Sequence, residues 1–272
     1  MISAMKLDFI KADPAGNTTV FVLTPVPPAL RAQAARKIMS PAGVGAEQVG
    51  FVSEGRMDMM GGEFCGNASR SYGAYLALRG PDGRTLRGFS GTQRVDVTVS
   101  GTREPLPVLV QGLGEDNVCR AAIRMPLPLS VTPLTDPVLG DCTLVCFEGI
   151  AHLLLPNREP RESDLAPARA LAASLGEEPP CVGLIYTAGE TALRPLVFVR
   201  ETGTLVWESS CASGSCAAAA AYALARGQSC DVDLSQPGGT LSCRATVENG
   251  AVTALTLGGP VRFTAAGTLF LD

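Results

Sequence analysis

The sequence predicts a mixed α+β protein built from two similar halves. Most of the 272 residues alternate between short strand-like stretches and turn residues, whereas four stretches have helical spacing. Two short segments about half a chain apart also resemble each other. Hydrophobic residues make up 46% of the chain and charged residues 18%, which is typical of a folded globular protein.

The first half is expected to hold two helices among several strands. Strands at Met5–Ile10 and Thr19–Leu23 flank the turn-forming segment A-D-P-A-G-N. Apolar residues at helical spacing predict a helix over Pro28–Met39. A second helix over Ala68–Leu78 is expected to end at Arg-Gly. Further strands are expected at Gln48–Ser53, Gly55–Met60, Arg94–Ser100, Val108–Gln111 and Ala121–Met125.

The second half repeats this texture. A helix is expected over Ser163–Ser174, with Ser163 as its N-cap, and another over Gly214–Arg226, ended by Gly227. The strands are expected at Thr143–Phe147, Ala151–Leu155, Val182–Tyr186, Leu196–Val199, Thr204–Trp207, Asp231–Leu234, Thr240–Val247, Ala251–Leu257 and Val261–Phe270.

The two halves share a local pattern. F-C-G-N-A-S-R-S-Y-G-A-Y-L-A-L-R-G begins at Phe64, and S-C-A-S-G-S-C-A-A-A-A-A-Y-A-L-A-R-G begins at Ser210. Each has a Cys, a small residue, Asn or Ser, and then a helix that ends near Tyr-x-x-x-Arg-Gly. The pattern indicates two lobes, each with one helix N-terminus. Chance similarity of two Ala-rich helices is the alternative, because Ala and Gly are common.

Charge and hydropathy argue against several classes of protein. The net charge is -4 and the chain has no run of Lys or Arg, so we expect no nucleic-acid partner. The charged N-terminal segment lacks the apolar core of a signal peptide, and no uncharged apolar stretch of about 18 residues is present. We therefore expect a cytoplasmic protein without a membrane partner.

The chain has nine cysteines and a single histidine, and these counts limit the kinds of metal or disulfide site that it can form. An odd number of cysteines without an export signal indicates thiols in a reducing compartment, most of them buried. The pairs Cys142/Cys146 and Cys211/Cys216 lack C-x-x-C spacing. One His cannot complete a Cys/His zinc set, so we expect no metal.

Two of these cysteines, Cys65 and Cys211, precede the helices of the repeated pattern. A helix N-terminus lowers the pKa of a nearby thiol and binds anions such as carboxylates. Asn67 and Ser213 are expected as N-caps. Two such ends suit stereoinversion, in which one thiolate removes an α-proton and the opposing thiol delivers another. A buried inert thiol is the alternative for either Cys alone, and a redox dithiol is the alternative for the pair.

Several motifs then match one family in order along nearly the whole chain. They are D-F-I-K-A-D-P-A-G-N-T-T-V-F-V at 8–22, G-V-G-A-E-Q-V at 43–49, C-G-N at 65–67, G-I-A-H at 149–152, S-C-A-S-G-S-C-A at 210–217 and L-G-G-P at 257–260. These motifs resemble the diaminopimelate epimerase family of cofactor-independent amino-acid racemases and epimerases.

The resemblance implies two pseudo-symmetric lobes, each a curled, mostly antiparallel β-sheet around a central helix, with the site in the cleft. The N-terminal lobe would span residues 1–127 and carry Cys65, with the last strand, 261–272, returning to it. The C-terminal lobe would span 128–260 and carry Cys211. The resemblance implies Cys65 and Cys211 as the acid–base pair, a free amino acid as substrate and no cofactor; a homodimer is left open. The substrate-site residues that it implies are Asn17, Gly66, Asn67, Ala212, Ser213, His152 and Glu208. For His152 a hydrogen-bonded core histidine is the alternative, and for Glu208 a surface carboxylate.

Departures from that family bear on the substrate. Ser209 stands where diaminopimelate epimerases have the Arg that holds the distal carboxylate, and Cys181 stands where they have a side-chain-binding Asn. Diaminopimelate epimerases also have an Asn upstream of the first active-site Cys, and the matching position here lies among Met57, Met59 and Met60. The compact E-S-S-C-A-S-G-S segment and A-E-Q-V-G look more like the histidine racemases of metallophore biosynthesis. Glu47 would then meet a basic side chain such as imidazole, and a helix-start or loop carboxylate is the alternative. Diaminopimelate epimerase and a non-catalytic amino-acid-binding or redox protein of this fold are the alternatives.

Overall fold

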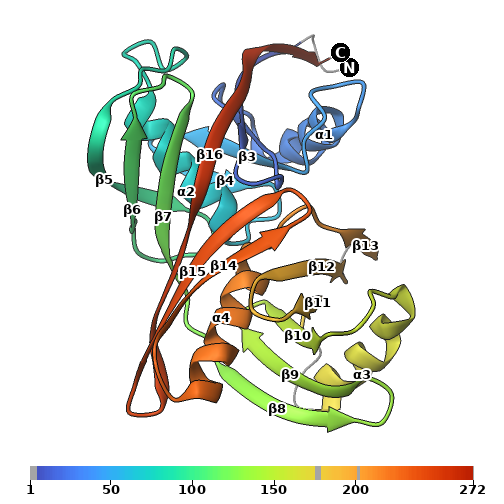
Figure 1. Cartoon of the computed structure of the whole chain (residues 1–272). Helices are drawn as coiled ribbons and strands as arrows, with labels where there is room; N and C mark the ends of the chain where they lie inside the picture. Colours follow the sequence, from blue (N-terminus) through green and yellow to red (C-terminus); the bar gives the residue numbers. More distant parts are fainter. Residues whose placement is uncertain (1–4, 175–178, 201–202, 272) are drawn as a thin grey trace. The chain divides into compact units, whose positions relative to one another are not determined.

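The computed structural model describes residues 5–174, 179–200 and 203–271 and shows a mixed α+β, sheet-rich protein (Figure 1). The described part divides into two compact units. Unit 1 comprises residues up to Ile123 together with the segment from Gly258 onwards, and unit 2 comprises Arg124–Leu257.

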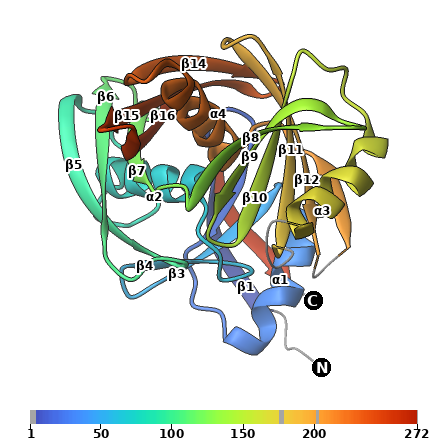
Figure 2. The same cartoon turned by 90° about the horizontal axis from the view of Figure 1, so that it is seen from below.

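Unit 1 winds one long run of strands around a buried helix. Its elements are β1 (Met5–Asp13), β2 (Thr19–Val22), α1 (Pro28–Met39), β3 (Gln48–Ser53), β4 (Arg56–Met59), α2 (Gly66–Leu78), β5 (Ser90–Val99), β6 (Leu106–Leu113), β7 (Val118–Met125) and the second part of β16 (Ala251–Leu271). β1 pairs antiparallel with β2, β2 parallel with β3, β3 antiparallel with β4, and β4 parallel with β5. β5, β6 and β7 form an antiparallel meander. α2 packs against β5 and β6 (Figure 2).

Unit 2 repeats this order of pairings. Its elements are β8 (Ser130–Asp136), β9 (Gly140–Phe147), β10 (Ile150–Pro156), the 3₁₀ turn η1 (Glu162–Asp164), α3 (Leu165–Ser174), β11 (Cys181–Ala188), β12 (Ala192–Val199), β13 (Thr204–Trp207), α4 (Ala212–Arg226), β14 (Cys230–Gln236), β15 (Gly239–Glu248) and the first part of β16. β9 pairs antiparallel with β10, β10 parallel with β11 across α3, and β11 antiparallel with β12. β12 pairs parallel with β14 across α4, and β14 antiparallel with β15. α4 packs against β14 and β15 (Figure 2).

The two central helices are buried on nearly all sides. In α4 the run Ala217–Ala220 is fully buried, and such small side chains allow the helix to approach the strands closely. α2 is buried from Gly66 to Tyr75 although it carries polar residues, among them Arg70. These polar groups need hydrogen-bond partners inside the protein, because water does not reach them.

The predicted helices and most predicted strands are confirmed, and α1, β3 and β13 have the expected bounds. The N-cap predictions were wrong. α2 begins at Gly66 and α4 at Ala212, so Cys65 and Cys211 occupy the cap positions, and Asn67 and Ser213 lie inside the first turn. Ser163 lies within η1 rather than capping α3.

The last part of the chain also differs from the prediction. Two strands, Ala251–Leu257 and Val261–Phe270, were expected to be separated at Gly-Gly-Pro, whereas β16 is one strand of 21 residues. It continues because β15 and β7 are its neighbours, and β1 pairs with its residues 262–271. The sequence also missed β8, which pairs antiparallel with β9 and is largely exposed.

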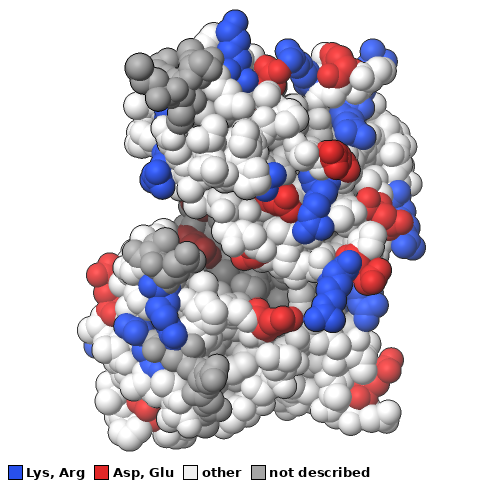
Figure 3. Space-filling model, turned by 180° about the vertical axis from the view of Figure 1, so that it is seen from behind, with Lys and Arg blue, Asp and Glu red and all other residues white. Residues whose placement is uncertain are grey.

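The face seen in Figure 3 has no patch of a single charge sign, because Lys and Arg side chains are interspersed with Asp and Glu. Within the described ranges, no helix combines the length and the apolar character needed to span a membrane.

The close approach of α2 to β6 predicts an unusual response to a helix substitution. A Cβ at Gly73 would lie 2.6 Å from Val108 Cβ, which leaves no room for a methyl group. Gly73→Ala should therefore lower the free energy of unfolding by about 1–3 kcal/mol, because overpacking outweighs the better helix propensity of Ala. Urea denaturation measures the change. At the exposed position Ala32 in α1, Ala32→Gly should show the ordinary propensity loss of about 1 kcal/mol. A gain in stability for Gly73→Ala would contradict the packing argument.

Candidate active site

The two central helices begin in the same way. Cys65 caps α2 with φ -126° and ψ 114°, and Cys211 caps α4 with φ -122° and ψ 114°. In each helix a Ser amide four residues on, Ser69 or Ser215, donates to the carbonyl of the capping Cys at 2.9 and 3.0 Å. The first backbone N–H groups of a helix have no partner within it, so each Cys lies beside a set of amides that can bind an anion.

In unit 2 the backbone of Cys211 is held by a side chain from β14. Gln236 Oε1 accepts a hydrogen bond from the Cys211 N–H at 2.8 Å, and Gln236 Nε2 donates to Ser215 Oγ at 3.0 Å. Ser215 Oγ in turn donates to the Cys211 carbonyl at 2.7 Å. This closed set of bonds fixes the cap residue, and therefore the direction in which its thiol leaves the helix.

The Cys211 thiol is buried, and burial raises its pKa well above the ordinary value. The negative charge of Glu208, which contacts the thiol, raises it further. The neighbouring Gly214 amide and the Ser213 hydroxyl, whose Oγ lies 3.7 Å from Sγ, act in the opposite direction. The expectation that a helix start would lower the pKa of this thiol was wrong, because burial outweighs the helix terminus here.

His152 lies on β10 and is fully buried. Its Nε2 is 2.8 Å from Ser213 Oγ, and Ser213 in turn lies beside Cys211, so the imidazole is joined to the thiol through one hydroxyl. Its Nδ1 has no hydrogen-bond partner within the described residues. Burial lowers the His152 pKa to about 3, which keeps the ring neutral near pH 7. Gly183 on β11 leaves room for the ring, because a Cβ there would collide with Nδ1.

In unit 1 the Cys65 thiol faces an amide instead. Cys65 Sγ donates to Gln48 Oε1 at 3.4 Å. Gln48 Nε2 donates to Asn17 Oδ1 at 2.7 Å and to Thr19 Oγ1 at 2.8 Å. Asn17 Nδ2 donates to Glu47 Oε2 at 2.9 Å. A continuous hydrogen-bonded chain therefore runs from Glu47 to Cys65.

A second branch enters this chain from α2. The fully buried Arg70 donates to Asn67 Oδ1 at 3.2 Å, and Asn67 Nδ2 lies 3.4 Å from Asn17 Oδ1. The Arg70 guanidinium also donates to the carbonyls of Gly259 and Pro260 on β16 at 2.9 and 3.0 Å. Arg70 thus joins the first turn of α2 to the strand that arrives from the far end of the chain.

The structure brings the predicted residues together within each unit. Unit 1 places Asn17, Glu47, Asn67 and Cys65 in one network, with Gly66 opening the helix. Unit 2 places His152, Glu208 and Ser213 around Cys211, with Ala212 opening the helix.

Sequence reasoning missed Gln48, Arg70 and Gln236. Gln48 and Arg70 lie inside motifs already noted, at 43–49 and just after Cys-Gly-Asn, so their polar character in buried segments was an available signal. Gln236 had none, because it lies 25 residues from Cys211 at the end of a strand.

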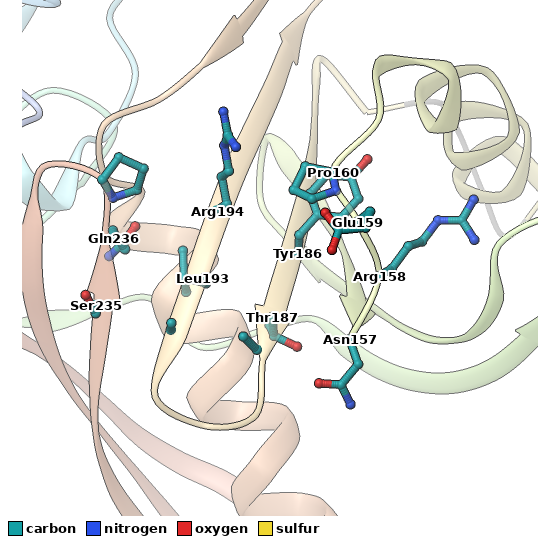
Figure 4. A pocket seen from close by; sticks show the side chains of 13 residues that line it. Asn157, Arg158, Glu159, Pro160, Tyr186, Thr187, Leu193, Arg194, Ser235 and Gln236 are labelled. Carbon is teal, nitrogen blue, oxygen red and sulfur yellow. The ribbon is translucent and has the colours of Figure 1, made fainter.

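Gln236 also lines a groove on unit 2 (Figure 4). The groove runs between Asn157–Pro160, which follow β10, and side chains of β11, β12 and β14 such as Tyr186, Arg194 and Ser235. Apart from Gln236, its lining shares no residue with the surroundings of Cys211 described above. Within the described ranges, no group of three or more His, Cys, Asp or Glu side chains is placed to hold a metal ion.

Comparison with known proteins identifies the family. Residues 6–270 match the family described as the histidine racemase CntK N-terminal domain. The chain belongs to the histidine racemase family. A histidine racemase from Fusobacterium nucleatum subsp. nucleatum is 34% identical, over 97% of both chains. One from Staphylococcus aureus is 28% identical over 86% of this chain and 87% of its own.

Solved structures resemble this racemase in fold. A predicted epimerase from Pseudomonas aeruginosa has a TM-score of 0.67 at 14% identity, covering 98% of this chain and all of its own. A PhzF-family phenazine biosynthesis protein from Bacillus anthracis has a TM-score of 0.64 at 15% identity, covering 99% and 100%. A hydroxyproline epimerase from Agrobacterium vitis has a TM-score of 0.61 at 12% identity, covering 98% and 92%.

These relatives make the chain an isomerase of the racemase class, as the sequence predicted. The motif resemblance to histidine racemases is confirmed. Membership of the diaminopimelate epimerase family itself stays a prediction.

The buried neutral His152 of this racemase predicts a pH-dependent stability. In the unfolded chain an ordinary His binds a proton below about pH 6.5, whereas folded His152 binds one near pH 3. Its contribution to stability is therefore complete above about pH 6.5 and falls by about 1.4 kcal/mol per pH unit as the pH drops towards 3. Urea denaturation at pH 6.5 and 4.5 should show a loss of about 2 kcal/mol.

The matched control is His152→Gln, since His152 is the single histidine of the chain. This variant should lose that slope between pH 6.5 and 4.5. The carboxyls whose pKa is lowered, Asp58, Asp82 and Asp164, add their own slope in more acidic solution. An unchanged slope in His152→Gln would show that the imidazole is not held neutral.

Proposed function

We propose that this chain racemises free histidine by a two-base mechanism without a cofactor, with Cys65 and Cys211 as the acid–base pair. The single observation that carries the proposal is the matched placement of these two cysteines as caps of the two buried helices. Family membership supports the same reaction class. The mechanism also accords with two pseudo-symmetric lobes of the diaminopimelate epimerase type, which the repeated order of strand pairings favours.

The chemistry needs one thiolate and one thiol. A cysteine thiolate takes the α-proton of one enantiomer, and its electron pair stays on the substrate as an α-carbanion. The other cysteine then donates its thiol proton to the opposite face, which gives the other enantiomer and leaves the proton on the first sulfur. Backbone amides at both helix starts would stabilise the negative charge that develops on the substrate carboxylate.

The surroundings of Cys211 suit this proton traffic. Its thiol carries a proton at rest, because burial and the charge of Glu208 raise its pKa. The Glu208 carboxylate in contact with the thiol is placed to accept that proton when Cys211 acts as the base. Neutral His152 orients the Ser213 hydroxyl beside the sulfur, and Ser213 can donate to the thiolate that forms.

Substrate recognition would divide between the two ends of the amino acid. The backbone N–H groups of Gly66, Asn67, Ala212 and Ser213 would hold the α-carboxylate, and Asn17 would contact the same amino-acid part of the substrate. The exposed Glu47 carboxylate offers an acceptor for an imidazole N–H beyond its bond to Asn17. Ser209 offers no charge for a distal carboxylate, which disfavours diaminopimelate as substrate.

Two further expectations belong to this proposal. A cytoplasmic location follows from the sequence-based prediction of a reducing compartment. A homodimer stays open beside a monomer.

The reaction is tested by exchange of the α-proton. L-Histidine incubated with the enzyme and reductant in deuterated water should yield D-histidine labelled with deuterium at the α-carbon. Cys65→Ser and Cys211→Ser should each lower kcat by about 10²–10⁴-fold, since each removes one acid–base group. Chiral chromatography with mass spectrometry measures both.

The control is Cys146→Ser, which changes a partly buried cysteine of β9 that no step uses. It should keep wild-type activity. Full activity in either Cys65→Ser or Cys211→Ser would remove that residue from the mechanism, and activity on diaminopimelate in place of histidine would overturn the substrate assignment.

The Glu47 assignment has its own test. Glu47→Gln keeps the hydrogen-bonding shape but removes the charge, so KM for histidine should rise by about 10-fold or more, as for the loss of a charged hydrogen bond of about 1.5–3 kcal/mol. KM for an uncharged amino acid that is also racemised should change far less. Equal changes for both substrates would mean that Glu47 does not contact the side chain.

A further inference from the structure

The hydrogen-bonded chain from Glu47 to Cys65 has a fixed direction. A carboxylate only accepts hydrogen bonds, so the atom of Asn17 that faces Glu47 is its NH₂ group. The carbonyl of Asn17 then lies on the other side and requires donors. Gln48 supplies one at 2.7 Å, which must be its NH₂ group.

The orientation of Gln48 follows from the same rule. Because its NH₂ group is used by Asn17 and Thr19, its carbonyl oxygen is the atom that faces Cys65. A carbonyl accepts from a thiol S–H but repels the lone pairs of a thiolate. The Cys65 S–H group therefore donates to Gln48, Gln48 donates to Asn17, and Asn17 donates to the Glu47 carboxylate, which is the final acceptor.

Arg70 imposes the same direction independently. A guanidinium only donates, so the Asn67 oxygen faces Arg70 and the Asn67 NH₂ group faces Asn17. Asn17 Oδ1 therefore receives donors from both Gln48 and Asn67. The guanidinium of the fully buried Arg70 is held by the carbonyls of β16, so it stays directed at the Asn67 oxygen.

We propose that Gln48 is a positioning residue that keeps Cys65 protonated in the resting enzyme, and that Glu47 sets its orientation through Asn17. This rests on the proposed function, because it assigns a state to one of the two proposed acid–base thiols. Glu47 lies at one end of this chain, Arg70 at the end of the branch through Asn67, and Glu63 two residues before Cys65 in the sequence. Lys11 donates to the carbonyls of Val44 and Gly45, just before Glu47. The amides at the start of α2 oppose the effect, since they favour the thiolate.

The consequence concerns the order of events. With its proton held by Gln48, Cys65 begins turnover as the acid that delivers a proton. It becomes a base only when the Gln48 carbonyl turns away or is displaced. Glu47 would then have two tasks, since a substrate side chain that binds its carboxylate also touches the group that orients Gln48.

The test is the pH profile of Cys65 alkylation by iodoacetamide, without substrate, followed on the Cys65 peptide by mass spectrometry. Gln48→Met removes the carbonyl, so alkylation below the midpoint should become about two- to tenfold faster and the midpoint should move to lower pH. Gln48→Glu places a carboxylate beside the sulfur, so its midpoint should move to higher pH. A merely structural role would not shift the two variants in opposite directions.

Glu47 is tested with a double-variant cycle. Glu47→Gln alone should lower the midpoint by less than Gln48→Met does, because it removes one of the two constraints that orient Asn17 and leaves the one from Arg70. In the Gln48→Met background it should add nothing if the effect travels through Gln48. Gln111→Met, on an exposed position of β6, is the control and should leave the profile unchanged.

Equal midpoints in wild type, Gln48→Met and Gln48→Glu would overturn the proposal, as would shifts of the same sign in both variants. Circular dichroism checks that each variant is folded, and if one is not, the sign of the shift in the other still decides. Because alkylation needs no turnover, these outcomes are independent of whether the chain racemises histidine.

Discussion

Burial of two helix N-termini is the constraint on which the rest of this structure depends. α2 and α4 lie against their strands closely enough that Gly73 and a run of fully buried alanines are required at the contact. Their first turns are therefore shielded from water, where unpaired polar groups are costly. Gln236, Ser215, Asn67 and Arg70 meet that cost with hydrogen bonds. In unit 2 the same bonds fix the capping residue Cys211.

The N-termini of α2 and α4 have similar cap geometry, but different kinds of side chain surround their capping cysteines. Around Cys211 the partners are a carboxylate, a hydroxyl and a neutral imidazole, all of which can exchange or reorient a proton. The Cys65 thiol donates to the side-chain amide of Gln48, which accepts a hydrogen bond from the thiol but does not take its proton. The two thiols thus differ in the groups that can exchange a proton with them, although both are cysteines that cap a helix.

Glu47 and Arg70 show how a remote charge can matter without touching the sulfur. In the network described above both act through the amides of Asn17, Asn67 and Gln48, because a carboxylate only accepts and a guanidinium only donates hydrogen bonds. Every amide between them must orient accordingly. Loss of either charge would remove one of the two constraints that set this direction.

The sequence by itself determined the local features. Helical spacing and Arg-Gly stop signals located the helices, and the repeated Cys segment with the in-order motifs indicated a racemase with Cys65 and Cys211 at helix starts. Only the tertiary structure decided which residue caps each helix, that β16 is continuous, and that burial raises the pKa of Cys211. The physical reason is the distance along the chain between interacting residues. The spacing of residue types in a sequence indicates contacts only between residues a few positions apart. Cys211, however, is held by Gln236, 25 residues away, and Arg70 by Gly259, 189 residues away. Such partners, and the exclusion of water that makes them necessary, arise only when the chain is folded.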